Sequence, residues 1–156
     1  MKPFSTDNFL EFLNVPKYEY AFADPSNVVR LADDIEIIAP KIELISYPDR
    51  IDGFEQRRRL IADGYELLGA EAFYLFWKNK RLMPTAFKKM TSDEKMGSHA
   101  KIFFDADILL MPYYKYEVTL ALYRDTDVLG RLSWWYETDR RDSFRSDYRT
   151  SAVYRK

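Results

Sequence analysis

An alternating run of side chains between residues 114 and 122 constrains the fold of this chain more than any other feature. One side of the run carries the aromatic and aliphatic residues Tyr114, Tyr116, Val118, Leu120 and Leu122. Side chains two positions apart share one face of a strand, so this pattern predicts a half-buried antiparallel strand. A second alternation at 128–137 follows the turn Asp125-Thr126-Asp127. Together they predict a β-hairpin.

Short apolar runs elsewhere predict further strands. They are rich in β-branched and aromatic residues and are bounded by Pro, Gly or Asp, which punctuate strands. These runs lie at 18–22, 35–38, 42–47, 65–76, 107–111 and 150–154.

Helices are expected in three places. Ser5, Thr6 and Asp7 offer N-cap side chains for a helix within residues 1–16, which Pro16 ends. Asp52 is the expected cap of a helix that runs to about Asp63, and Gly64 supplies the left-handed residue after it. The third helix is predicted from Ser92 to Phe104, because Met96, Ala100, Phe103 and Phe104 recur at helical spacing.

The order of these elements predicts a single domain over residues 1–156. We expect an α+β fold of the order β-α-β-α-β-β-β, with a mixed, mainly antiparallel sheet and helices packed on one face. The chain has 156 residues, the size of one ordinary globular domain. A polar, arginine-rich segment at 138–149 separates the hairpin from the last strand.

Gly64-Tyr65, Leu68-Gly69 and Phe73 together resemble a signature of small bacterial α/β proteins, many of them predicted lipoproteins. In those proteins the signature reads GY-x-x-φG-x-x-x-F, and an Ala-Asp strand like 106–110 and a closing segment like 147–154 follow it. The resemblance covers residues 40–156. This chain contains no cysteine that could accept a lipid. The resemblance implies a fold and no activity.

Composition excludes several kinds of chemistry. The chain has no cysteine, which removes disulfides, thiolate metal sites and cysteine nucleophiles, and its one histidine, His99, cannot build a multi-histidine metal centre. We therefore expect no cofactor and no metal, and a binding protein rather than an enzyme. The longest apolar run, at 108–114, is too short to cross a membrane. A cytoplasmic location without membrane contact is the resulting expectation.

Two alternative functions remain: single-stranded nucleic-acid binding on the same hairpin surface as protein binding, and metal-dependent hydrolysis. Aromatic and basic residues interleave along the hairpin, as on sheets that stack the bases of single-stranded nucleic acids. However, the whole chain has a formal net charge of −1, so no strong field attracts a polyanion. The second alternative is a metal-dependent hydrolase that uses the carboxylates of Asp105 and Asp107, which share one side of a strand.

Recognition of a protein is the favoured hypothesis. Aromatic residues make up 17% of the chain, and tyrosine and tryptophan, which dominate interface hot spots, outnumber phenylalanine. If Tyr114 and Trp134 fill the core, their neighbours face outward. The residues expected to contact a partner protein or a second copy are Tyr113, Lys115, Tyr123, Arg131, Trp135, Arg140 and Arg141. The competing possibility is that another segment of the same chain covers this face.

Overall fold

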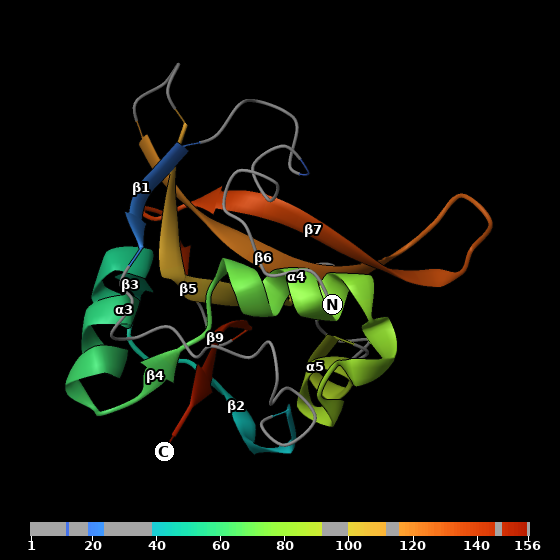
Figure 1. Ribbon diagram of the computed structural model, residues 1–156, viewed down its shortest axis with the longest axis horizontal. Helices are drawn as coiled ribbons and strands as arrows, with labels where there is room; N and C mark the ends of the chain where they lie inside the picture. The colour runs from blue at the N-terminus through green and yellow to red at the C-terminus, as the bar shows by residue number, and fades with distance from the viewer. Residues whose placement is uncertain are drawn as a thin grey trace.

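The fold is a curved sheet flanked by helices (Figure 1). The computed structural model describes residues 12, 19–23, 39–91, 100–111, 116–145 and 148–155. Within these ranges, seven strands form one sheet with the path β2-β9-β5-β6-β7, while β1 pairs with β5 and β4 with β9. Among the strand pairs of the described residues, only β5 and β9 run parallel. The α+β class and the mainly antiparallel sheet are confirmed.

The strand bounds are as follows. The large sheet contains β1 (Glu19–Ala23), β2 (Ile42–Ile45), β4 (Glu66–Leu67), β5 (Lys101–Met111), β6 (Tyr116–Thr126), β7 (Leu132–Arg140) and β9 (Arg149–Tyr154). A second, two-stranded sheet pairs β3 (Ile51–Asp52) with β8 (Phe144–Arg145).

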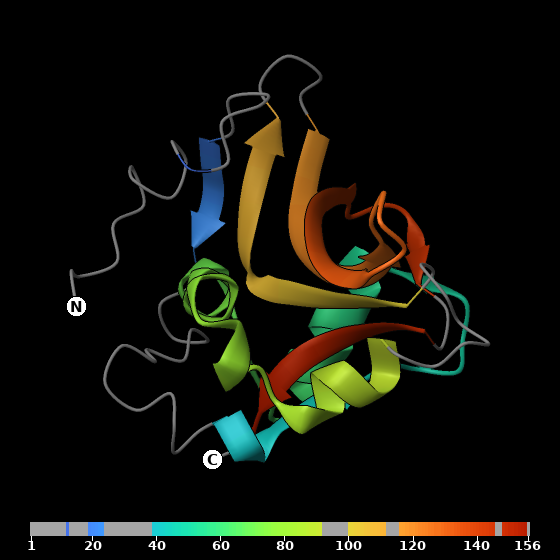
Figure 2. The same cartoon turned by 90° about the vertical axis from the view of Figure 1, so that its right-hand side faces the viewer.

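A sharp bend in β5 gives the sheet its curvature (Figure 2). The register between β5 and β6 shifts between Phe104 and Leu109, which marks an irregularity in the ladder. On its other edge, the first part of β5 pairs with β9 and the part after the bend pairs with β1. The bend therefore lets two strands of different direction share one edge of β5.

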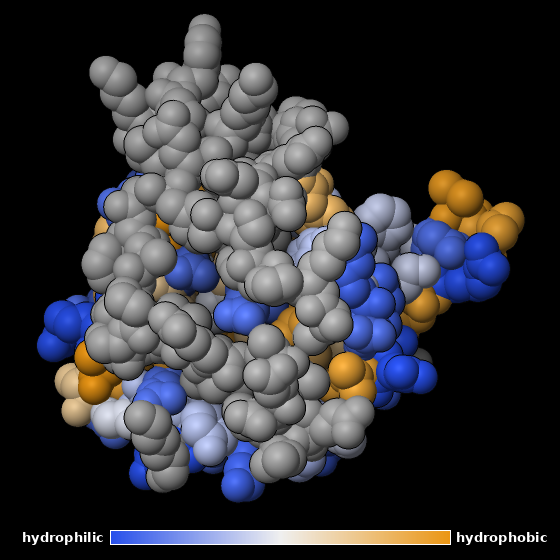
Figure 3. All heavy atoms as spheres, in the orientation of Figure 1, coloured by the Kyte–Doolittle hydropathy of each residue, from blue (hydrophilic) through white to orange (hydrophobic). Residues whose placement is uncertain are grey.

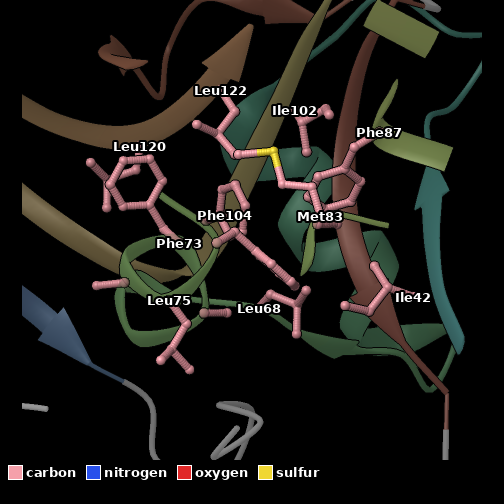
Figure 4. Packing of buried hydrophobic residues seen from close by; sticks show 14 of the residues in the cluster. Ile42, Leu68, Phe73, Leu75, Met83, Phe87, Ile102, Phe104, Leu120 and Leu122 are labelled. Atoms are coloured by element: carbon pink, nitrogen blue, oxygen red, sulfur yellow. The ribbon is translucent and has the colours of Figure 1, made fainter. Parts of the chain in front are cut away.

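The main core lies between one face of the sheet and the helices α4 (Ala70–Lys78) and α5 (Thr85–Thr91). Phe73 from α4 and Phe87 from α5 both pack edge-on against Phe104 of β5 (Figure 4). Ala152 of β9 faces the same cluster. Large aromatic side chains thus hold both helices to the sheet.

Helix α3 (Gly53–Ala62) packs on the opposite side of β9. Its buried Leu60 contacts Leu67, Ala106 and Val153 in a separate cluster. Val153 and Ala152 are adjacent in a strand, so their side chains point to opposite faces. The sheet therefore carries helices on both faces, with α4 and α5 together on one of them and α3 on the other, which corrects the expectation that all helices pack on one face.

Several predicted elements are confirmed. Asp52 accepts a hydrogen bond from the backbone N–H of Glu55 and begins α3, as its cap position predicts. Gly64 follows that helix with a φ of 87°, a backbone conformation that favours glycine. The strands predicted at 18–22, 42–47 and 150–154 correspond to β1, β2 and β9.

Two predicted elements are wrong. The strand predicted at 65–76 is instead the short β4 followed by α4, a mostly buried helix whose apolar run resembles a strand. Phe103 and Phe104, predicted to end a helix, lie in β5 on opposite faces.

Some observed elements were not predicted from the sequence, and some predicted elements lie outside the described residues. Helix α5 was not predicted, and neither were the 3-10 turns η1 (Ala39–Lys41) and η2 (Lys80–Leu82). The strand predicted at 35–38 lies outside the described residues. So does the helix within 1–16, apart from Phe12, which is helical.

Candidate protein-binding surface

The predicted hairpin is formed by β6 and β7, and it projects from the body of the molecule (Figure 1). Nine residue pairs connect the two strands, from Val118 and Arg140 at the base to Thr126 and Leu132 near the end. The turn lies slightly later than the predicted 125–127, since Asp127 N–H donates to the carbonyl of Arg131.

Asp127 organises the turn, and residues 127–131 are called the hairpin tip below. Its carboxylate accepts hydrogen bonds from the backbone N–H groups of Leu129 and Arg131, at 2.9 and 3.0 Å. The Arg131 N–H and the other donors hold the pKa of Asp127 below its ordinary value. Gly130 has a φ of 77°, which closes the loop. These bonds keep the tip in one conformation.

The inner face of the hairpin belongs to the core. The Tyr136 ring packs edge-on against Trp77 with centroids 4.7 Å apart, and Phe73 approaches it from α4. Trp134 is half-buried against the same cluster, and the Arg124 guanidinium lies 5.1 Å from its ring centroid. These aromatic residues stabilise the fold and leave little ring surface for a partner.

The hairpin outer face, which we define as Tyr123, Ser133, Trp135 and Glu137, points away from that core. Trp135 retains 42% of its surface exposed, and it pairs directly with Tyr123 across the two strands. Its indole Nε1 donates to the carbonyl of Asp125 at 3.3 Å. Tyr123 is half-buried, and this burial together with nearby Glu137 raises the pKa of its hydroxyl. An exposed indole beside a phenol is a common composition for a contact surface.

Charged residues border this face on the side of β9. The Lys101 ammonium contacts both Glu137 and Asp139, the latter at 3.1 Å, and Arg149 lies 3.3 Å from the Asp139 carboxylate. These groups neutralise one another. The border of the hairpin outer face is therefore polar, and the charges of these four side chains sum to zero.

The structure separates the predicted contact residues. Tyr123, Arg131 and Trp135 lie together on the hairpin, and the Arg131 side chain is 71% exposed. Arg140 is exposed at the hairpin base, where it pairs with Asp142 at 2.6 Å. Tyr113 and Lys115 lie outside the described residues.

The expectation that Arg141 faces a partner is wrong. The residue is only 6% exposed, its guanidinium donates to Glu117 at 2.6 Å, and it lies 4.1 Å from the ring centroid of Phe54. The chain reverses after β7, so Arg141 points back into the molecule. Its position in an arginine-rich segment gave no sign of this partner, which is 24 residues earlier.

A buried ion pair, which the sequence did not reveal, lies beneath α3. Arg145 donates to both carboxylate oxygens of Asp105 at 2.7 and 2.8 Å, and Ser151 donates to the same carboxylate. Both charged side chains are almost fully buried, at 2% and 1% exposure. Burial alone would raise the pKa of Asp105, but the Arg145 charge and its hydrogen bonds lower it below the ordinary value.

Asp107 also serves the fold. Its carboxylate accepts a hydrogen bond of 2.7 Å from the backbone N–H of Ala70, the first residue of α4. Burial raises the pKa of this carboxyl group above its ordinary value. The two carboxylates considered for a metal-dependent hydrolase are thus both engaged within the protein. Among the described residues, no three His, Asp or Glu side chains group as metal ligands would.

No protein-family model, curated protein or solved structure matches this chain. In the described part of the chain, none of the helices has the length and apolar character needed to cross a membrane.

Proposed function

We propose that this protein is a non-enzymatic interaction module that binds a protein partner, or a second copy of itself, through the β6–β7 hairpin. The observation that carries the proposal is the 42% exposure of Trp135 on strand β7, whose other two rings, Trp134 and Tyr136, turn toward the core. An indole on an open sheet surface offers a large contact area with little loss of conformational entropy. The proposal places this function in the cytoplasm.

The contact residues follow from the position of Trp135. Tyr123 lies beside it across the hairpin, and Arg131 is exposed in the hairpin tip, immediately before β7. Both residue types favour protein interfaces, since each combines apolar contact with hydrogen-bonding groups. Arg140 lies at the base of the hairpin on the face opposite Trp135, where its guanidinium is 4.5 Å from the ring centroid of Tyr116, a residue packed against the main core. Arg141 is not part of the surface because it is buried.

Single-stranded nucleic acid fits this surface less well. Most basic side chains of the region are paired with carboxylates: Lys101, Arg131, Arg140, Arg141, Arg145 and Arg149. Paired cations contribute little to the counterion release that drives nucleic-acid binding. Binding to an oligonucleotide that weakens steeply with salt would favour this second class instead.

The test compares Trp135→Ala with the wild-type protein as bait, under conditions where both are folded. The expected result is that proteins recovered specifically by the wild type are lost with Trp135→Ala, or that self-association seen by light scattering is lost. The matched control is Tyr148→Ala, which removes another exposed ring of 41% exposure outside the hairpin. Unchanged recovery and unchanged assembly for Trp135→Ala would contradict the proposal.

A further inference from the structure

The outer edge of β7 is an edge of the large sheet. Within the described residues, β7 ends the strand path, and β6 is the only strand that pairs with it. The Asp127 N–H donates to the carbonyl of Arg131 just before β7, and the Arg141 N–H donates to the carbonyl of Glu117 just after it. Both bonds join odd-numbered residues of the hairpin. Because backbone groups alternate in direction along an antiparallel strand, the odd-numbered residues of β7 direct their N–H and C=O groups to β6.

The N–H and C=O groups of Leu132, Trp134 and Tyr136 therefore point away from β6. We define these groups as the open edge. No strand of the described residues pairs with them. Each residue offers one donor and one acceptor, so the open edge presents the hydrogen-bonding pattern that a further strand would match.

Length and regularity distinguish β7 from other strands at the margins of this sheet. Natural edge strands are kept from pairing by short length, irregular register, proline or charged side chains. Strands β2 and β4 have four and two residues, and the register between β1 and β5 shifts. In contrast, β7 has nine residues in unbroken register with β6. Its charged residues begin at Glu137, so the segment 132–136 has none of these protections.

The side chains of the segment 132–136 are uncharged, and two of them are well exposed. Trp135 on the hairpin outer face is 42% exposed, and Leu132 on the opposite face is 48% exposed. Val128 and Leu129 of the hairpin tip add exposed apolar surface, which Figure 3 shows at the far end of the hairpin next to hydrophilic residues. A strand paired with the open edge would place its alternate side chains beside Trp135 and Leu132.

We infer that the open edge binds an extended segment of a partner protein, which adds to the sheet as a strand beside β7. The inference rests on the proposed function and specifies its partner as an uncharged segment rich in β-branched and aromatic residues. Such residues favour strands and pack well against aromatic side chains on a neighbouring strand. In this mode of binding, main-chain hydrogen bonds supply affinity and alternate side chains supply specificity.

A short peptide segment suits the open edge better than a nucleic acid or a second folded copy. Alternating donors and acceptors match a peptide backbone, whereas the phosphates of a nucleic acid offer acceptors only. The segment 132–136 is roughly 14 Å long. A contact of this length buries much less than the about 800 Å² per partner of a standard interface between folded proteins. It is large enough for the weaker binding of a flexible segment.

The test uses as its probe a synthetic peptide selected against the 156-residue chain from a random phage-displayed library. Backbone amide exchange is measured by nuclear magnetic resonance with and without this peptide. In the free protein, the odd-numbered amides of β7 should exchange slowly because they face β6, and the open-edge amides should exchange fast. Peptide binding should slow exchange at the open edge by at least about tenfold and leave the odd-numbered amides unchanged.

A proline variant tests the same hydrogen bonds. Leu132→Pro removes one outward N–H, and proline is tolerated in an edge strand where that N–H faces away from the sheet. We expect this variant to bind the peptide at least about tenfold more weakly than the wild type. The matched control Leu132→Ala keeps the N–H and loses only apolar contact, so it should bind less than about threefold more weakly. Circular dichroism confirms that both variants are folded.

Three results overturn the inference. The first is slow exchange of the open-edge amides in the free monomer, because another segment of the same chain then covers the edge. The second is slowing that appears with rising protein concentration in the absence of peptide, because a second copy is then the occupant. The third is a library that yields no peptide able to slow these amides.

The outcome for the proposed function is separate. If the open edge fails any of these tests, a protein partner that is lost with Trp135→Ala would still support binding through the hairpin outer face. Conversely, peptide-dependent slowing at the open edge, together with a Trp135→Ala variant that recovers the same proteins as the wild type, would support strand addition and contradict the role of Trp135.

Discussion

Gly69 lies so close to Asp107 that a Cβ at position 69 would be 2.5 Å from the Asp107 carboxylate oxygen. The same oxygen accepts the N–H of Ala70, so the short glycine brings the start of α4 against β5. Two parts of the sequence signature, the second glycine and the Ala-Asp strand, thus meet in space.

This contact predicts that Gly69→Ala destabilises the protein by about 1–3 kcal/mol, because the added methyl group must displace a buried carboxylate. Gly64→Ala is the matched control. Its Cβ would meet nothing within 4 Å, but its φ is 87°, so we expect a smaller loss of about 1 kcal/mol. Urea unfolding measures both. An equal or smaller loss for Gly69→Ala would contradict the close packing.

The buried ion pair predicts a large effect of Asp105→Asn. This change leaves the Arg145 guanidinium buried without a negative partner, which costs about 3–5 kcal/mol. The measurement is the urea midpoint at neutral pH. Arg58→Ala, which breaks an exposed pair with Glu55, is the control and should change the midpoint little. A loss as small as that of the control would contradict the burial of Asp105.

The pH dependence of stability follows from the same group. The folded pKa of Asp105 is lowered, so its contribution is fully present above the unfolded pKa of about 3.9 and is lost as pH falls through the folded value. Asp107, with its raised pKa, acts in the opposite sense: its contribution is lost as pH rises through the folded value. We expect Asp105→Asn to lose less stability than the wild type upon acidification. An identical acid profile in urea unfolding would contradict this assignment.

The hairpin tip predicts a local effect of Asp127→Ala. Without the carboxylate, the N–H groups of Leu129 and Arg131 lose their acceptor, so both amides should exchange with deuterium faster. Amides in the middle of β7 should exchange at the wild-type rate. Uniformly faster exchange along β7 would show that the turn determines the whole hairpin, contrary to this description.

Sequence patterns predicted the elements whose stabilising contacts are local. The part of the alternation at 116–122 lies in β6, and the Asp52 cap and Gly64 set the ends of α3. Helix α4 was missed because its first turn is capped by Asp107, which is 37 residues away in sequence, and because its small and apolar residues are buried on most sides. Periodicity cannot separate such a helix from a buried strand.

For the candidate site too, sequence patterns predicted the features that depend on neighbouring residues and missed those that depend on distant ones. Alternation along β7 correctly separated exposed Trp135 from inward Trp134. It gave no information about Arg141 or Arg145, whose partners Glu117 and Asp105 are distant in sequence. Arginine is exposed in most contexts, so only the tertiary fold could reveal that these two are buried.

Replacement of each of the two neighbouring tryptophans should change stability by a different amount. Trp134→Ala removes a half-buried ring from the core and should cost on the order of 2 kcal/mol. Trp135→Ala should change the urea midpoint less, because 42% of this residue's surface is exposed and its ring lies outside the core cluster. If Trp135→Ala lost more stability than Trp134→Ala, the Trp135 ring would be a stabilising part of the fold.

The most direct test of the binding surface observes the indole N–H signals of the three tryptophans by nuclear magnetic resonance. On addition of a recovered partner, or upon self-association at rising protein concentration, the signal of Trp135 should shift or broaden while those of Trp77 and Trp134 stay in place. Movement of Trp77 or Trp134 with an unchanged Trp135 would contradict the assignment of the hairpin outer face as the protein-binding surface.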